Sequence, residues 1–236
     1  MAKKVFIGVG HGGKDPGATA NGWKEKDLNL EIATACNEEL VRHGVSTKMS
    51  RTKDEEDTLQ QEINECNAYN PDLAIDIHNN AGGGDGAEAF YHYKGGVSKT
   101  LADNVLAEIV KLGQNSRGAK TKQGADGRDY YGFIRQTTAP AIIVETAFVD
   151  NTKDMQIIDT AAERKAMGIA VAKGILKTLN IAYVEAVKKE ETKTETKMEA
   201  TSSKLYRVQV GAYSVKANAE AMLKKLKAAG FDGIIV

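Results

Sequence analysis

The sequence predicts an α/β fold: an open, twisted and mostly parallel sheet covered by helices, with a small α+β piece at the C-terminal end. Short runs of apolar, often β-branched residues at 5–10, 73–77 and 141–144 are typical of buried strands, and strands buried on both faces are typical of parallel sheets. Segments with helical periodicity alternate with these runs up to residue 182. That alternation predicts a sheet whose strands are connected by helices.

Strands and helices are expected to follow one another in order along this first region. The predicted strands are 5–10, 45–49, 73–77, 87–93 and 141–144, and the predicted helices are 27–42, 56–68, 97–112 and 161–179. Asp27 is the expected N-cap of the first helix, and Gly44 ends that helix. The second helix is expected to end at Asn70-Pro71, because a residue before proline disfavours the helical conformation.

The composition changes sharply after residue 182. Residues 183–203 are mostly Glu, Lys, Thr and Ser, and such a segment cannot bury enough apolar area to offset the entropy of ordering, so we expect a flexible linker. Residues 204–236 have the pattern of a strand, a helix at 216–229 and the start of another strand. A piece of this size is too small to fold alone. Either it pairs with something else, which makes self-association through the C-terminal segment an expectation, or the sequence stops in the middle of a domain.

Charge and hydropathy exclude several classes of function. The net charge is zero, from 32 basic and 32 acidic side chains, so nothing indicates a nucleic-acid partner or bulk attraction to a membrane. No run approaches the roughly 18 apolar residues that a transmembrane helix needs. The basic start at 1–4 leads into a glycine-broken strand and not into the apolar region of a signal peptide. We therefore expect synthesis in the cytoplasm without a secretion signal, and release before action on anything outside.

Three of the predicted buried strands each run into a residue that can bind a metal or move a proton. These residues are His11, His78 and Glu145. Because ligands bind outside the carboxyl ends of the strands in an open parallel sheet, the two imidazoles and the carboxylate are expected to meet at one edge. That arrangement is typical of a metal-assisted hydrolase. The other histidines have structural interpretations: His43 suits the end of a helix, and His92 lies inside a predicted strand.

Two imidazoles leave a tetrahedral zinc ion short of one protein ligand and a water. Glu25 lies just before the first predicted helix, at the same sheet edge, but a glutamate between two lysines is more often part of a solvated ion pair. The residues alone leave the third ligand open. Glu145 directly follows an apolar strand, where a carboxylate needs a partner. It is a candidate general base or acid.

Residues 8–13 have the spacing of a dinucleotide-binding loop, Gly-x-Gly-x-x-Gly. That fingerprint requires a helix that begins at the loop, whereas the first predicted helix begins more than ten residues later. We therefore expect these glycines to let the backbone wrap closely around a site. Cys36 and Cys66 both lie in helical patterns without metal-ligand spacing, and we interpret them as small buried hydrophobic residues outside any disulfide.

Several blocks of sequence occur together, in order, over about residues 4–180. They are Val-Gly-His-Gly-Gly-Lys-Asp-Pro-Gly-Ala at 9–18, Lys-Glu-Lys at 24–26, Arg51, Asp-Ile-His-Asn-Asn-Ala at 76–81, Ile-Arg at 134–135, and Pro-Ala-Ile-Ile-Val-Glu-Thr-Ala-Phe-Val-Asp-Asn at 140–151. With these blocks the chain resembles the type 3 family of zinc N-acetylmuramoyl-L-alanine amidases.

The resemblance implies a cofactor, a reaction and site residues. His11, Glu25 and His78 would be the zinc ligands, and Glu145 the catalytic glutamate that moves the proton. The reaction would be hydrolysis of the amide bond between N-acetylmuramic acid and L-alanine in peptidoglycan. Possible substrate contacts, interpreted from their positions, are Asn79, Asn80 and Arg135. The chain departs from the family at Glu62, where an arginine is common, and we expect that change to affect packing or loop support and not the metal.

The tail has a resemblance of its own. Arg-Val-Gln-Val-Gly-Ala-Tyr at 207–213, a helix, and then Gly230-Phe231 resemble the first half of a SPOR domain, a module that binds septal glycan. The predicted organisation is therefore a zinc amidase domain at 1–182, a linker at 183–203 and a partial SPOR-like wall-binding segment at 204–236.

Two other functions compete with the amidase. One is a non-catalytic peptidoglycan-binding module with a structural metal site, but structural zinc sites are closed by four protein ligands, mostly Cys and His. Here three ligands are predicted and none is Cys. The other is a different zinc hydrolase on the same fold, which would need only a changed pocket. Without a signal peptide, a phage endolysin or a mother-cell sporulation lysin fits better than a secreted autolysin.

Overall fold

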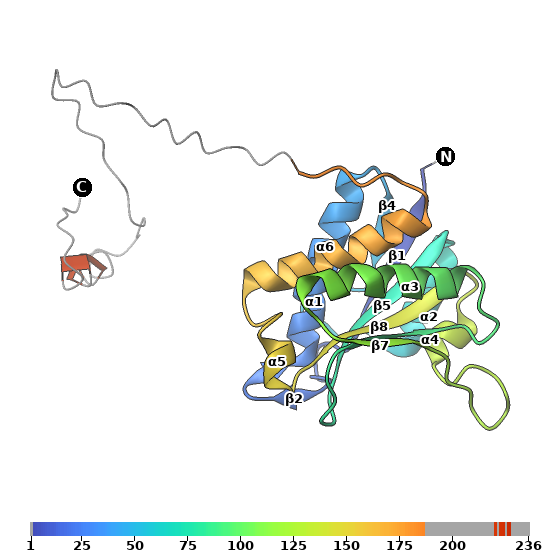
Figure 1. Cartoon of the computed structure of the whole chain (residues 1–236), viewed down its shortest axis with the longest axis horizontal. Helices are drawn as coiled ribbons and strands as arrows, with labels where there is room; N and C mark the ends of the chain where they lie inside the picture. The colour runs from blue at the N-terminus through green and yellow to red at the C-terminus, as the bar shows by residue number, and fades with distance from the viewer. Residues whose placement is uncertain (1, 187–219, 221, 225, 228–236) are drawn as a thin grey trace, which may run out of the picture. The chain divides into compact units, whose positions relative to one another are not determined.

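A computed structural model describes residues 2–186, 220, 222–224, 226 and 227 (Figure 1). The chain divides into two compact units, Met1–Ala186 and Val187–Val236. The six described residues of the second unit are helical, within the helix predicted at 216–229. The predictions of a linker at 183–203, of the two strands of the tail and of self-association fall almost entirely outside the described residues.

Within residues 2–186, six strands form one sheet with the order β4-β1-β5-β8-β6-β7. The strands are β1 (Lys4–Val9), β4 (Ser46–Met49), β5 (Leu73–Asn80), β6 (Ala87–Tyr91), β7 (Ser116–Lys120) and β8 (Ala141–Phe148). All neighbours are parallel except β6 and β8, which are antiparallel. The predicted α/β class with a mostly parallel, open sheet is confirmed. A separate two-stranded hairpin, β2 (Thr19–Ala20) and β3 (Trp23–Lys24), lies between β1 and the first helix.

Helices cover both faces of the sheet (Figure 1). On one face lie α1 (Glu25–Arg42), α3 (Val97–Ile109) and α6 (Ala161–Thr178), and on the other α2 (Leu59–Tyr69) and α4 (Gly132–Gln136). A short 3-10 turn, η1 (Val110–Leu112), extends α3, and α5 (Thr152–Met155) follows β8. Because side chains alternate along a strand, Val5 and Ile7 of β1 pack in the larger core under α1, α3 and α6, whereas Phe6 packs under α2 and α4.

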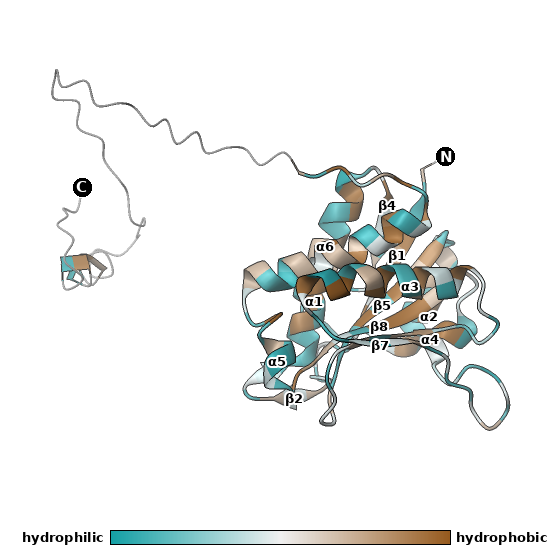
Figure 2. Cartoon of the chain, in the orientation of Figure 1, coloured by the Kyte–Doolittle hydropathy of each residue, from teal (hydrophilic) through white to brown (hydrophobic). Residues whose placement is uncertain are grey.

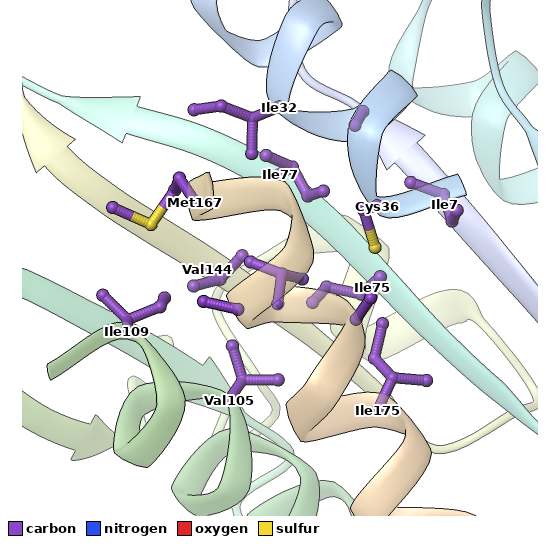
Figure 3. Close-up of a cluster of buried hydrophobic side chains, with 14 of the residues drawn as sticks. Ile7, Ile32, Cys36, Ile75, Ile77, Val105, Ile109, Val144, Met167 and Ile175 are labelled. Atoms are coloured by element: carbon purple, nitrogen blue, oxygen red, sulfur yellow. The ribbon is translucent and has the colours of Figure 1, made fainter. Parts of the chain in front are cut away.

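The larger core is built from aliphatic side chains of the central strands and of three helices. Figure 3 shows Ile75 and Ile77 of β5 and Val144 of β8 in one cluster with Val105 of α3 and Ile175 of α6. The central strands are mainly hydrophobic, while the helices carry residues of both kinds (Figure 2), as expected of helices with one buried face. None of the helices in the described part of the chain is long and apolar enough to cross a membrane.

Several element boundaries differ from the predictions. Helix α1 begins at Glu25 and not after Asp27, the predicted N-cap. The N-cap in the structure is Lys24, whose side chain makes no capping hydrogen bond. Strands β5 and β8 continue past His78 and Glu145 to Asn80 and Phe148. Both residues therefore lie inside their strands and not beyond the ends. The hairpin β2–β3, the edge strand β7 and the short helices α4 and α5 were not predicted.

The packed part of the first unit extends slightly beyond residue 182. Tyr183 packs against the larger core and stacks on His43 with ring centroids 4.9 Å apart. The backbone N–H of Val184 donates to Nε2 of His43 at 3.0 Å. His43 therefore has the structural role that its position at the end of α1 predicts.

Candidate active site

Glu25 is the first residue of α1, and its position depends on the turn before the helix. Its backbone N–H donates to the Ala18 carbonyl at 2.9 Å. Its carboxylate is buried and accepts hydrogen bonds from the backbone N–H of Ala18 at 2.8 Å and from that of Asn79, on β5, at 3.1 Å. Anchored on both sides, the carboxylate is fixed between the loop after β1 and the end of β5.

Two imidazoles lie against this carboxylate from opposite sides. Nε2 of His11 is 3.1 Å from Oε2 of Glu25, and Nδ1 of His78 is 2.9 Å from Oε1. The two rings are nearly perpendicular, with centroids 5.0 Å apart. One potential ligand atom from each of the three residues lies within 4.8 Å of the others. The structure therefore brings together the three predicted metal ligands, which are separated by up to 67 positions in the sequence.

The loop after β1 approaches these rings very closely. His11 has a left-handed backbone, with φ of 63°, which turns the chain back over the sheet edge. A Cβ on Gly10 would lie 2.2 Å from Cε1 of His78, so a side chain at position 10 would collide with the ring. This close approach agrees with the interpretation of the glycine-rich stretch as a backbone wrapped around a site.

Buried Arg51 also holds this loop in place. Its guanidinium donates to four backbone carbonyls, those of Val9 at 3.0 Å, Gly10 at 3.2 Å, Lys26 at 2.7 Å and Lys53 at 3.2 Å. These bonds tie the loop before His11 to the first turn of α1, next to Glu25. The sequence marked Arg51 through the family resemblance alone.

The charges in the cluster shift the ionisation of its members. Burial alone would raise the pKa of Glu25, yet the hydrogen bonds from His11 and His78 outweigh burial and hold that pKa far below its usual value. The hydrogen bond to Glu25 raises the pKa of His11 against the opposing effect of burial. Glu25 is therefore an anion at neutral pH, as a metal ligand must be.

The donor set fits a zinc ion. Zinc is bound in proteins by imidazole nitrogens and carboxylate oxygens as well as by thiolates, and catalytic sites use three protein ligands. Two histidines and an ionised glutamate whose ligand atoms converge meet both conditions.

Glu145 lies beside this cluster. It is paired in register with His78 across the parallel strands β5 and β8, so its side chain is on the same face of the sheet as the imidazole. Its Oε2 is shielded from solvent and accepts no hydrogen bond from the described residues. Burial raises the pKa of Glu145 to about 7, against an opposing effect of His78. A carboxyl group with such a pKa can both accept and donate a proton near neutral pH.

Comparison with known proteins identifies the family. A family profile described as N-acetylmuramoyl-L-alanine amidase matches residues 5–177. The chain belongs to this family. A second profile, that of the SPOR domain, matches residues 199–236.

Two curated relatives of this amidase match nearly its whole length. The N-acetylmuramoyl-L-alanine amidase CwlM of Bacillus licheniformis is 35% identical over 99% of the chain and 84% of its own length. The sporulation-specific N-acetylmuramoyl-L-alanine amidase of Bacillus subtilis strain 168 is 33% identical over the same shares. Among solved structures, Cwp6 from Clostridium difficile matches with a TM-score of 0.75 and 38% identity, over 76% of this chain and 30% of that one.

The structure assigns Asn79 of the amidase to the interior. The side chain is buried, its amide nitrogen donates to Asn29 at 2.8 Å, and its oxygen accepts from Thr146 at 2.6 Å. Both ends of the amide are thus hydrogen-bonded inside the protein, and a substrate contact by Asn79 stays a prediction. Its contribution is to position Glu25, through the backbone hydrogen bond given above.

Asn80 and Arg135 occupy different surroundings. The Asn80 side chain is half-buried and donates to Glu88 at 3.0 Å. Arg135 is exposed and donates to the backbone carbonyls of Asp129 and Tyr130 at 2.7 and 2.8 Å, so it supports the loop before α4. A substrate contact by either residue stays a prediction.

The remaining histidine and the cysteines lie outside the cluster. Nε2 of His92 is 3.2 Å from Asp129, and the residue follows β6 instead of lying within it. Cys36 and Cys66 are buried and free, as predicted. The sequence interpretation overlooked the carboxylates on the outer sides of the two imidazoles, Asp15 and Asp76.

Proposed function

We propose that the chain hydrolyses the amide bond between the lactyl group of N-acetylmuramic acid and L-alanine in peptidoglycan. The observation that carries this proposal is the convergence of His11, Glu25 and His78 with Glu145 in register beside them, in a chain of the amidase family. The three converging residues would hold a zinc ion.

A bound zinc ion would supply Lewis acidity toward the amide carbonyl and would lower the pKa of water at the site. The chain's own contribution to the chemistry is made by Glu145. Its Oε2 accepts no hydrogen bond from the described residues, so this atom can take a proton from the attacking water. The same carboxyl group then delivers the proton to the leaving nitrogen of L-alanine.

Glu25 cannot share this role. Both of its oxygens are engaged by imidazoles and backbone N–H groups, and its pKa is held low. A carboxylate in that state is a poor proton carrier and a good ligand. These different surroundings support different roles for the two glutamates.

The domain organisation is part of the proposal. Residues 1–182 would form the catalytic domain, 183–203 a linker, and 204–236 a wall-binding segment. The SPOR profile over 199–236 supports the last assignment. Peptidoglycan is then both the substrate of the first domain and the ligand of the tail, in a phage endolysin or a mother-cell lysin. A non-catalytic module with a structural metal site is disfavoured, because the cluster offers three ligands and lies beside a buried carboxyl oxygen, Oε2 of Glu145, that accepts no hydrogen bond from the described residues.

Digestion of purified cell walls with the full chain tests the proposal. The expected products are new N-terminal L-alanine and intact glycan strands. The control is the same preparation after exhaustive chelation, which should be inactive until zinc is added back. New reducing sugar ends without free alanine amines would instead identify a glycosidase, which uses paired carboxylates, and would overturn the proposal.

A further inference from the structure

Asp76 lies two residues before His78 on β5, so both side chains are on the same face of the strand. Its Oδ2 is 3.0 Å from Nε2 of His78. The aspartate is 3% exposed. A carboxylate so deeply buried is costly unless it has a partner, and the outer nitrogen of the His78 ring is that partner.

The two nitrogens of His78 therefore face different groups. Nδ1 faces Glu25, another residue of the potential metal cluster. Nε2 faces Asp76, which is not part of that cluster. When Nδ1 acts as a ligand it carries no proton, and the ring proton is then on Nε2, where it can be donated to Oδ2 of Asp76.

A second buried carboxyl group lies against Asp76 from α2. Oε1 of Glu62 and Oδ1 of Asp76 are both buried and accept no hydrogen bond from the N–H or hydroxyl groups of the described residues. The Glu62 carboxyl group can satisfy both oxygens by donating its proton to Asp76, since burial and the charge of Asp76 raise the pKa of Glu62 well above its usual value. This bond would orient the other oxygen of Asp76 toward His78.

Gly8 makes room for the two carboxyl groups. An ideal Cβ at position 8 would lie 1.9 Å from Oε1 of Glu62 and 2.8 Å from Oδ1 of Asp76. A side chain on this residue of β1 would therefore displace one of the carboxyl groups. The carboxyl groups of Glu62 and Asp76 thus occupy the space over Gly8. Asp76 in turn contacts Nε2 of His78.

We propose that Asp76 is the positioning carboxylate of the metal centre: it accepts the proton of His78 Nε2 and fixes the ring so that Nδ1 faces the metal. Gly8 and Glu62 shape the pocket that orients it. Partners of this kind set the tautomer and the orientation of ligating histidines, and their loss typically costs about 10–100-fold in metal affinity. The inference rests on the proposed metal centre of His11, Glu25 and His78.

The first test measures zinc affinity of the full chain by competition with a chelator of known affinity. Asp76→Asn keeps the size of the side chain and removes its charge, and Asp76→Ala removes the acceptor. Both should bind zinc about 10–100-fold more weakly than wild type. A matched control is Asp154→Asn, since Asp154 is also buried but accepts only backbone N–H groups, those of Gly86 and Phe148, among the hydrogen bonds described. It should keep wild-type affinity.

Each outcome separates this inference from the proposed function. Wild-type affinity in both Asp76 variants would overturn the inference and leave the metal centre intact. An equal loss in Asp154→Asn would also overturn it, because the effect would then be general destabilisation. A wild-type chain that binds no zinc would overturn the metal centre itself, and the inference with it.

A second measurement uses the wild-type chain and does not depend on the folding of a variant. The ¹⁵N–¹H couplings of the imidazoles in the zinc-loaded protein report which nitrogen carries the proton. His78 should carry it on Nε2, next to Asp76, and His11 on Nδ1, which is 2.7 Å from Asp15. The two metal-bound rings are thus expected to be opposite tautomers. A proton on Nδ1 of both rings would overturn the inference.

Discussion

The two halves of the metal cluster are built very differently. His11 belongs to a loop, has a left-handed backbone, and pairs on its outer side with Asp15, whose side chain is 66% exposed. His78 belongs to a central strand and pairs on its outer side with Asp76, whose side chain is 4% exposed. Glu25 contacts both imidazoles and connects the two halves.

This difference indicates where the geometry of the site is determined. The strand half is fixed by the register of β5 and β8 and by buried carboxyl groups, so a change there has few ways to relax. The loop half is held by buried Arg51, which donates to its backbone carbonyls, but the outer side of the His11 ring has only an exposed ion pair with Asp15, which water can replace. We therefore expect a larger effect from changing the buried carboxylate partner of His78 than from changing the exposed carboxylate partner of His11.

The largest effect is expected from removing the strand ligand. His78→Ala should abolish zinc binding and reduce amide hydrolysis to background, because two ligands would remain of three. Zinc content per chain and release of L-alanine termini are the measurements. The matched control is His92→Ala, since His92 is also an imidazole paired with an aspartate but is not in the cluster. Zinc loss from this control would mean that the histidines are wrongly assigned.

A smaller effect is expected from crowding the pocket behind His78. Gly8→Ala would place a Cβ 1.9 Å from Oε1 of Glu62. Overpacking of this kind typically lowers the free energy of unfolding by about 1–3 kcal/mol. Gly124→Ala is the control: its Cβ would lie 3.1 Å from Oδ1 of the Asp126 side chain and 3.9 Å from the Arg128 carbonyl oxygen, and the substitution should change the free energy of unfolding by less than about 0.5 kcal/mol. Equal thermal stability of Gly8→Ala and wild type would show that the pocket is not tightly packed.

The smallest effect is expected in the loop half. Asp15→Asn should weaken zinc binding by no more than about fivefold, because exposed ion pairs contribute little. The same chelator competition used for Asp76→Asn measures it. A loss as large as that predicted for Asp76→Asn would remove the distinction between the two halves.

The sequence predicted the central part of the fold because parallel strands buried on both faces produce continuous apolar runs. The edge strand β7, Ser-Arg-Gly-Ala-Lys, has no such run and lies partly exposed, so it carries no periodic signal. The start of α1 was misplaced because aspartate is a favoured N-cap residue, which made Asp27 the expected cap. The N-cap in the structure is Lys24, whose side chain makes no capping hydrogen bond. Helix α4 is five residues long, too short for its periodicity to be recognised.

The topology of the sheet explains why the predicted site residues lie close together. Parallel strands present their carboxyl ends at one edge, which brought His11, His78 and Glu145 together from three distant segments. Glu25 could not be derived in this way, because its place depends on the turn that precedes α1. Asp76 was missed although it interrupts an apolar strand, which is itself a signal that a buried partner is present.

A comparison of the two glutamates tests the assignment of metal ligand and proton carrier. Glu25→Gln and Glu145→Gln are isosteric changes of one residue each, measured for zinc content per chain and for amide hydrolysis. Glu25→Gln should lose zinc and activity together. Glu145→Gln should keep the zinc content of wild type and lose roughly two to four orders of magnitude in turnover, the usual contribution of a general acid–base group. If Glu145→Gln loses zinc while Glu25→Gln keeps it, or if Glu145→Gln retains full activity, the assignment of ligand and proton carrier is contradicted.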